Sequence, residues 1–516
     1  MKSAIYSYTD NIKRTKEEGV VEKIIDSLLY VKGFEKARIF EEVIFEDGSK
    51  GFIFSIDRDH CICLLTNQTQ AKKGLKVSRS DRLVGINLGE ALKGKIVNPF
   101  GMSLDKNNPV TNCHDFRIFD TEVPTIKDRA IIDENLHTGV TVVDMMVPLG
   151  KGQRELIIGD RGTGKNWFAN SVIKSAALNG IICIYCGIGK KKASVQGVLA
   201  DFKDFEGSKN IISLITYAND PLGTSYLAPY AAMTIAEYFK DSGNDILVVY
   251  DDLGTHAKIY REISLLCKRF PGRNSYPSDI FFTHSKLLER AGNFKTKGKN
   301  VSITCLPLVE SMGGDISGYV QTNLMSMTDG HIFFDIDMYN QGVRPAINYF
   351  LSVTRVGRQT QSAIKYKINR ELSNILSLYE KTKAFIHFGA EISEGVRLNL
   401  RLGERLLQFF DQTGDVLVPN NIQILVFVLI WNQRWDSYGK DQIQNEVKRL
   451  IYLYENDTDF MKIVDELASV STDLNNYIEN FSRYEDKLKE RVFPKGVKAR
   501  WGLLNILKMN LIVLHP

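Results

Sequence analysis

The stretch Glu155-Leu-Ile-Ile-Gly-Asp-Arg-Gly-Thr-Gly-Lys-Asn166 decides the fold of this chain. An apolar strand runs into a glycine-rich loop, and a helix is predicted over residues 166–177. In such a loop, glycines let backbone N–H groups surround phosphate oxygens, and the helix N-terminus adds partial positive charge. The stretch therefore predicts a nucleotide-binding phosphate loop, in preference to a chance glycine-rich turn. Its predicted phosphate-binding residues are Gly159, Asp160, Arg161, Gly162, Thr163, Gly164, Lys165 and Asn166.

Two positions bear on a metal ion at this loop. The last loop position is usually Ser or Thr, whose hydroxyl binds Mg²⁺, but here it is Asn166. An amide oxygen can bind Mg²⁺, although its side chain is longer and the required geometry is strict. The apolar run over residues 246–250 ends in Asp251 and Asp252, as expected for the carboxylate partner of Mg²⁺. Asn166 and Asp251 are the candidate metal ligands, and Asp252 is equally well explained as a helix cap.

Hydrolysis of the nucleotide requires a carboxylate that orients the attacking water, expected at the end of the next strand. That strand, over residues 181–185, is followed by Lys190-Lys-Lys192. A protonated lysine cannot act as a general base, and it would strengthen phosphate binding instead. A solvated basic turn explains these lysines equally well. In either case the site is predicted to hold a nucleotide and to be poorly equipped to cleave it.

The regions around this loop predict a multi-domain α/β fold. Apolar runs at 156–158, 181–185, 211–215 and 246–250 alternate with helical stretches, which is typical of a parallel sheet covered on both faces. Before this region, short runs that alternate apolar and polar residues, with a hairpin signal at Asp47-Gly48, predict a small β-barrel. After it, apolar residues that recur with a period of 3.6 predict a helical bundle. The expected domains are a tail (1–18), a β-barrel (19–93), a P-loop domain (94–361) and a helical domain (362–516).

Composition narrows the class of protein. The 516 residues are 44% hydrophobic and 25% charged, as in ordinary globular proteins, which excludes disordered, collagen-like and coiled-coil chains. A net charge of +5 is too mild to indicate a nucleic-acid binder. Seven cysteines exclude a disulfide-stapled fold, and Cys183 and Cys186 are predicted to be core residues on opposite faces of a strand. With no secretory signal and no apolar run of about 20 residues, the chain is expected to be soluble.

Further stretches give the chain a close resemblance to a known family, the alpha subunits of rotary F-type ATP synthases. The alpha-type loop Gly-Asp-Arg-Gln-Thr-Gly-Lys-Thr is matched at six of eight positions, with departures at Gly162 and Asn166. The other matching stretches begin at Thr138, Val147, Tyr226, Tyr250, Phe270, His284, Thr322, Gly342 and Ser352, and they cover the α/β core densely.

The resemblance implies a RecA-like P-loop core in a hexameric head, where alpha and beta subunits alternate around a rotating shaft. Alpha subunits hold a tightly bound, non-catalytic ATP or ADP, with Mg²⁺ at a site that here contains Asn166. In Ser352-Val-Thr-Arg-Val-Gly357, Arg355 is the residue that completes the neighbouring beta subunit's catalytic site, with Ser326 and Thr354 near the same interface. Such arginines contribute roughly 10³ to 10⁵ in rate. The alternative for Arg355 is a structural salt bridge.

The resemblance also implies an adenine pocket, whose residues map to Tyr339, Arg344, Pro345 and Gln412. A second family glutamine falls near Gly414 or Asp415, so base contacts there are not expected. Lys190 stands where alpha subunits carry Gln and catalytic beta subunits carry Glu.

Three functions are compatible with the sequence. The leading one is a non-catalytic subunit of a proton-driven ATP synthase. Its expected partners are the beta subunits, the central shaft and the peripheral stalk. It is expected to bind no nucleic acid and to reach the membrane only through the complex. The alternatives are an autonomous homohexameric P-loop ATPase, such as an export motor or helicase, and a scaffold that has lost its nucleotide. The chain is rich in Lys, Asn and Ile, has 13 prolines and shows no convincing transit peptide. This composition favours a location on the matrix side of the mitochondrial inner membrane. The alternative location is a bacterial plasma membrane or a thylakoid.

Overall fold

The chain forms two compact units in a computed structural model that describes residues 7–67, 71–296, 298–386, 394–412, 414 and 416–492. The first unit combines Met1–Asp133 with Gly150–Phe334, and the second combines Glu134–Leu149 with Asp335–Pro516. A β-barrel, a sheet covered by helices and a set of C-terminal helices are all present, which confirms the predicted multi-domain α/β fold class. The predicted domain boundaries stay predictions.

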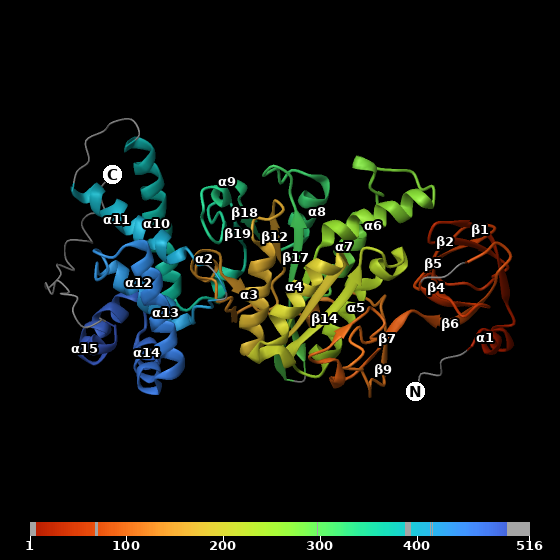
Figure 1. Cartoon of the computed structure of the whole chain (residues 1–516), viewed down its shortest axis with the longest axis horizontal. Coiled ribbons are helices and arrows are strands. Elements are labelled where there is room, and N and C mark those ends of the chain that lie inside the picture. The colour runs from red at the N-terminus through yellow and green to blue at the C-terminus, as the bar shows by residue number, and fades with distance from the viewer. Residues whose placement is uncertain are drawn as a thin grey trace. The chain divides into compact units, whose positions relative to one another are not determined.

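The N-terminal part of the first unit is a closed six-stranded barrel, drawn in red and orange in Figure 1. Its strands run in the order β1-β2-β5-β4-β3-β6, and the predicted Asp47-Gly48 turn joins β3 to the antiparallel β4. The barrel interior is apolar, with Phe45, Ile53 and Cys63 fully buried. A short helix, α1 (Tyr8–Thr15), lies in the segment predicted as a tail. The strands are β1 (Glu18–Ile25), β2 (Leu28–Lys32), β3 (Glu41–Phe45), β4 (Lys50–Ile56), β5 (Cys61–Leu65) and β6 (Lys76–Leu83).

A mainly parallel sheet forms the centre of the first unit. Its strands run in the order β18-β12-β17-β15-β13-β14-β8, and every one of these neighbouring pairs is parallel. The predicted apolar runs become β12 to β15, and their residues are almost all buried, as expected for strands covered on both faces. The strands are β8 (Ile96–Val97), β12 (Glu155–Gly159), β13 (Ile182–Lys190), β14 (Ile211–Tyr217), β15 (Ile246–Asp251), β17 (Lys299–Glu310) and β18 (Gly330–Phe334).

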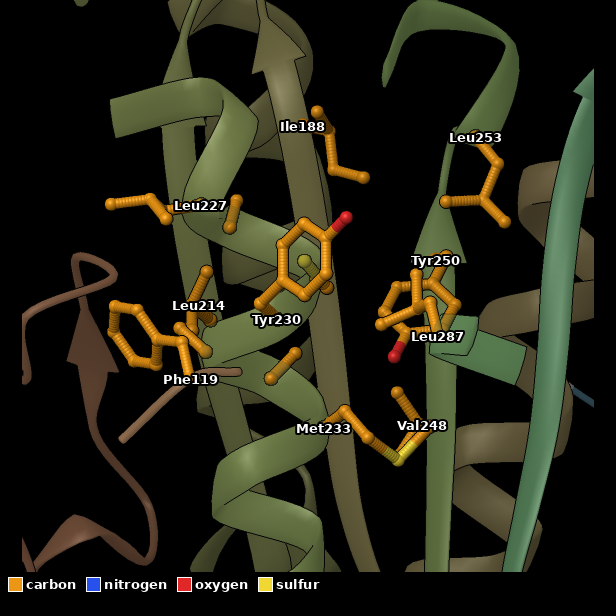
Figure 2. Packing of buried hydrophobic residues seen from close by; sticks show 14 of the residues in the cluster. Phe119, Ile188, Leu214, Leu227, Tyr230, Met233, Val248, Tyr250, Leu253 and Leu287 are labelled. Carbon is orange, nitrogen blue, oxygen red and sulfur yellow. The ribbon is translucent and has the colours of Figure 1, made fainter. Parts of the chain in front are cut away.

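Helices cover this sheet, and their apolar faces share one core with it. Figure 2 shows labelled side chains of α5, β15 and α7, among them Met233, Val248 and Leu287, gathered in one apolar layer. Cys183 and Cys186 of β13 are buried free thiols, which confirms that they are core residues. The helices are α3 (Lys165–Leu178), α4 (Lys192–Lys203), α5 (Leu222–Asp241), α6 (Leu253–Leu266), α7 (Ile280–Leu288) and α8 (Tyr319–Met327). The remaining strands are β7 (Gly85–Leu88), β9 (Asp115–Ile118), paired with β7, and β16 (Gly292–Thr296), antiparallel to β17.

The second unit is mostly helical. Leu372, Ile375 and Leu376 of α10 are buried, as the 3.6-residue period predicts. In α12 nine successive residues are buried, since this helix lies at the centre of the bundle. The elements are β10 (Asn135–Leu136), α2 (Thr141–Met146), α9 (Ile336–Asn340), β19 (Val353–Thr354), α10 (Ala363–Ile386), α11 (Glu394–Phe410), α12 (Asn420–Trp431), α13 (Lys440–Asn456), α14 (Thr458–Val470) and α15 (Leu474–Val492). The two-residue strand β11 (Leu149–Gly150) has one residue in each unit.

Short 3₁₀ turns complete the two units: η1 (Glu90–Leu92), η2 (Ile126–Asp128), η3 (Glu206–Asn210), η4 (Arg273–Ser275) and η5 (Gly357–Thr360). Within the described residues, no helix has the length and apolar character needed to cross a lipid bilayer.

Candidate nucleotide site and exposed arginine

The phosphate loop lies where the sequence predicts it, between β12 and α3. Gly162 and Gly164 adopt φ of 84° and 105°, a backbone conformation that glycine adopts far more readily than other residues. The first turn of α3 follows at once, so its free N–H groups border a cavity of about 490 Å³. The ends of β13 and β15 and the start of α4 line the same cavity. This is the arrangement that binds phosphate groups in other P-loop proteins.

A distant loop holds the phosphate loop in place. Asp160 accepts hydrogen bonds from the Ser311 hydroxyl at 2.5 Å and from the Gly314 N–H at 3.1 Å. Thr163 closes the loop from within, because its hydroxyl donates to the Asp160 carbonyl at 2.7 Å. Neither Ser311 nor Gly314 could be assigned from the sequence, since about 150 residues separate them from Asp160.

Lys165 is folded onto its own loop. Its ammonium donates to the carbonyl oxygens of Gly159 and Asp160 at 2.7 and 2.6 Å. Burial lowers the pKa of Lys165, and the nearby Glu310 carboxylate opposes that shift. A phosphate in the cavity would offer this buried cation a full negative charge in place of two carbonyl dipoles. Binding of the terminal phosphates by Lys165 stays a prediction from its position in the loop.

The predicted metal ligand Asp251 is engaged by three neighbours at the end of β15. One carboxylate oxygen accepts a 2.7 Å hydrogen bond from the Tyr185 hydroxyl, and the Asn166 amide nitrogen lies 3.5 Å from that oxygen. The other oxygen forms an ion pair with the Lys190 ammonium, which also lies 3.9 Å from Asp252. Burial, reinforced by Asp251, raises the pKa of Tyr185 well above its ordinary value. Lys190 is thus a member of the site and not a solvated basic turn.

Asp252 is a helix cap. Its carboxylate accepts a hydrogen bond from the Thr255 N–H at the start of α6, which confirms the structural explanation of this residue. Glu310, at the end of β17, is a carboxylate that the sequence did not indicate, and it lines the cavity together with Lys165. No sequence motif marks the end of β17. Glu310 reaches the cavity because β17 lies directly beside β12 in the sheet, so only the strand order could have indicated it.

The predicted adenine-pocket residues lie in the second unit. The Arg344 guanidinium stacks on the Tyr339 ring at 3.7 Å and donates to the Tyr339 carbonyl at 2.8 Å, and Pro345 follows directly. The Gln412 amide is buried: its oxygen accepts from the Thr141 N–H at 3.0 Å, and its nitrogen donates to the Gly139 carbonyl at 2.8 Å. Contact of these residues with a nucleotide base stays a prediction. Of the positions considered for a second glutamine, Asp415 lies outside the described residues.

Arg355 is exposed, and among the described residues it has no hydrogen-bond or ion-pair partner. The backbone that carries it is nevertheless fixed. The Thr354 hydroxyl donates to the Pro148 carbonyl at 3.1 Å and accepts from the Gly357 N–H at 3.0 Å. A Cβ at Gly357 would lie 1.7 Å from the Pro148 oxygen, so only glycine fits there. Thr354 is therefore a support of the arginine loop.

The family resemblance predicts that Ser326 lies near the same interface as Arg355. It is exposed in α8 of the first unit, and its hydroxyl donates to the Asn323 carbonyl at 2.7 Å. Its predicted place at a subunit interface stays a prediction.

Comparisons with known proteins agree with this geometry. Residues 139–354 match the nucleotide-binding domain of the ATP synthase alpha/beta family, and residues 361–484 match the C-terminal domain of ATP synthase alpha/beta chains. The ATP synthase subunit alpha of Neorickettsia sennetsu is 36% identical over 476 residues, which cover 89% of this chain and 93% of that protein. That of Clostridium botulinum is 34% identical over 505 residues, covering 97% and 95%. The phosphate loop between β12 and α3 lies within the matched region, and the chain belongs to the family of F-type ATP synthase alpha subunits.

Proposed function

We propose that this chain is a non-catalytic alpha subunit in the head of a proton-driven ATP synthase. Its phosphate loop stores ATP or ADP, and its Arg355 completes the catalytic site of an adjacent beta subunit in an alternating hexamer. The observation that carries the proposal is the ion pair of Lys190 with Asp251. Lys190 stands at the end of β13, where hydrolysis would require a free carboxylate. A cation there favours retention of phosphate over attack by water.

The state of Arg355 supports its proposed role on a neighbour. A structural salt bridge would give this residue a carboxylate partner, and the described part of the chain offers it none. A guanidinium is always charged and presents a planar set of donors, which suits it to the γ-phosphate oxygens of a nucleotide on another subunit. There it would stabilise the negative charge that develops during phosphoryl transfer. Thr354 and Gly357 would position the loop for this contact.

The remaining parts of the proposal come from the family. The base of the stored nucleotide would be held by Tyr339, Arg344, Pro345 and Gln412. The beta subunits, the central shaft and the peripheral stalk would be the partners. The mitochondrial inner membrane stays a prediction from composition, and the two relatives named above, both bacterial, lend it no support.

Hydrolysis by the full-length chain alone tests the non-catalytic role. We expect negligible ATP turnover by the purified chain, with turnover appearing only when beta subunits are added. Robust turnover by the chain alone, stimulated by RNA or by an export substrate, would instead support the autonomous ATPase. In that case Glu310→Gln should abolish the activity, because Glu310 is the carboxylate that lines the cavity with Lys165.

A further inference from the structure

We propose that the nucleotide stored on this chain is bound without a divalent cation, and that the Lys190 ammonium provides the positive charge that Mg²⁺ provides in other P-loop sites. The inference rests on the proposed function, since it assumes that the phosphate loop holds a nucleotide. It concerns Asn166 in the phosphate loop and Lys190 at the end of β13, which both differ from the residues that the family carries there. Both side chains face the Asp251 carboxylate.

The donor set at this site does not fit Mg²⁺. This ion requires six oxygen ligands in a near-ideal octahedron at 2.0–2.1 Å, including at least one protein carboxylate or hydroxyl. The carboxylate that would serve is Asp251, whose side chain is only 4% exposed. One of its oxygens is bound to the Lys190 ammonium and the other to the Tyr185 hydroxyl. A divalent cation on Asp251 would therefore lie against a second positive charge.

The loop position that usually binds the metal has also changed its chemistry. A Ser or Thr hydroxyl would present an oxygen to the ion, whereas Asn166 presents its amide nitrogen toward Asp251 at 3.5 Å. An amide nitrogen carries hydrogens and can donate them to a carboxylate or a phosphate, but it is not a ligand for Mg²⁺.

Lys190 is well placed to replace the ion. Its side chain is 19% exposed and lines the same cavity as Lys165 and the first residues of α3. A charge with little solvent around it interacts more strongly with phosphate than a surface lysine does. Lys165 and Lys190 would then bind the phosphates from two sides, with Asp251 and Tyr185 holding Lys190 in position. This pairing also explains why a lysine occurs at the position where catalytic subunits of the family carry a carboxylate.

Nucleotide binding with and without the metal tests the inference. The full-length chain is stripped of nucleotide, and ATP affinity is measured by equilibrium dialysis in excess EDTA and in excess MgCl₂. We expect the two dissociation constants to agree within about threefold. A tenfold or greater gain in affinity with MgCl₂ would overturn the inference and leave the stored nucleotide intact. No binding under either condition would overturn the proposed nucleotide storage itself, so the two failures are distinguishable.

Two substitutions should convert the site to a metal-dependent one. Asn166→Thr restores the hydroxyl, Lys190→Gln releases Asp251, and the double variant is expected to bind ATP at least tenfold more tightly with MgCl₂ than with EDTA. Lys192→Gln is the matched control, because this lysine is exposed, lies two residues away and does not line the cavity. Mn²⁺ gives a second readout by electron paramagnetic resonance. With ATP present, one bound Mn²⁺ per double-variant chain and none per wild-type chain supports the inference; one bound Mn²⁺ per wild-type chain overturns it.

Discussion

Lys190 and Arg355 are two cations of this chain in opposite situations. Lys190, at the end of β13, lines the nucleotide cavity and forms an ion pair with Asp251. Arg355, just after β19, is exposed and has no partner among the residues that the structure describes. The Lys190 charge is paired with a carboxylate inside the chain, whereas the described residues provide no such carboxylate for Arg355. An unpaired guanidinium on a loop fixed by hydrogen bonds is what a residue that acts on another subunit requires.

The comparison also separates position from chemistry. The phosphate loop has the glycine backbone of a P-loop, while Asn166 stands where the loop pattern has Ser or Thr. In the arginine loop, Thr354 and Gly357 hold the backbone, and the described residues give the Arg355 guanidinium no hydrogen-bond or ion-pair partner. We therefore expect substitutions in the two regions to affect different quantities: turnover for the arginine loop, and nucleotide affinity for the phosphate loop.

The largest effect is expected at Arg355 itself. Arg355→Ala removes the charge that would stabilise the γ-phosphate on the neighbouring subunit, so ATP turnover by the assembled complex should fall roughly 10³-fold to 10⁵-fold. The measurement is the steady-state hydrolysis rate of the complete complex, with its subunit composition checked by native mass spectrometry. Arg355→Lys keeps the charge but loses the planar pair of donors, and we expect it to remain well below wild type.

Arg358→Ala is the matched control for Arg355. Arg358 lies three residues after Arg355 and is exposed. Its substitution by Ala removes the same positive charge as Arg355→Ala does. Turnover near wild type in Arg358→Ala and strongly reduced in Arg355→Ala is the predicted pattern. Turnover near wild type in both variants would show that the assignment of Arg355 is wrong.

A smaller effect is expected from the support of the arginine loop. Gly357→Ala places a methyl group 1.7 Å from the Pro148 oxygen and 2.6 Å from the Thr354 hydroxyl, so the loop must shift. A displacement of about 1 Å in a positioned group can lower a rate about 100-fold. We expect a loss of that size in turnover of the complex. Gly395→Ala, in α11 of the same unit, is the control, since nothing lies within 4 Å of its added Cβ; an equal loss there would contradict the prediction.

The two units should also respond differently to acid. In the first unit His256 is fully buried between α5 and α7, 3.1 Å from His284, and burial lowers its pKa to about 4. The unfolded chain takes up this proton near pH 6.5, so between pH 6.5 and 4 it binds more protons than the folded chain does, and stability falls as pH falls. At pH 5 the loss from His256 is about 2 kcal/mol.

The second unit should withstand the same change. Burial tends to raise the pKa of Asp144, but His137 and Lys365 hold it well below its ordinary value, so its contribution is lost only when the pH falls below about 4. Hydrogen exchange at pH 7.5 and 5, followed separately in β15 and α12, measures the difference. His256→Phe should weaken the acid response of the first unit, and an undiminished response would assign it to other groups.

Much of this fold could be predicted from the sequence, because local patterns determine it. Fully apolar runs marked the strands β12 to β15, and the glycine spacing marked the loop between β12 and α3. Lys190 could also be recognised as a departure from a catalytic site, since its position follows from the strand that precedes it. These features depend on neighbours in the sequence, and sequence analysis finds such features well.

The contacts that give the sites their properties could not be predicted in the same way. The Tyr185 hydroxyl reaches Asp251 across 66 residues, and the Thr354 hydroxyl reaches the Pro148 carbonyl across 206. Tyrosine and threonine are common, so neither carries a signal in the sequence. The pairing of Lys190 with Asp251 needs the parallel register of β13 and β15, which brings their carboxyl ends to one edge of the sheet.

Substitutions of Lys165 and Arg355 should change different quantities, ATP affinity for Lys165 and turnover of the complex for Arg355. Lys165→Met keeps the length of the side chain and removes its charge, which eliminates hydrogen bonds to phosphate worth about 1.5–3 kcal/mol. ATP affinity of the full-length chain should fall about 10-fold to 100-fold, as measured by equilibrium dialysis, while Lys203→Met, on an exposed lysine of α4, should leave it unchanged. Arg355→Ala should show the reverse pattern, with the stored nucleotide retained and turnover lost. If Lys165→Met lowered turnover of the complex as strongly as Arg355→Ala does, the two regions would share one catalytic role and the division between them would not hold.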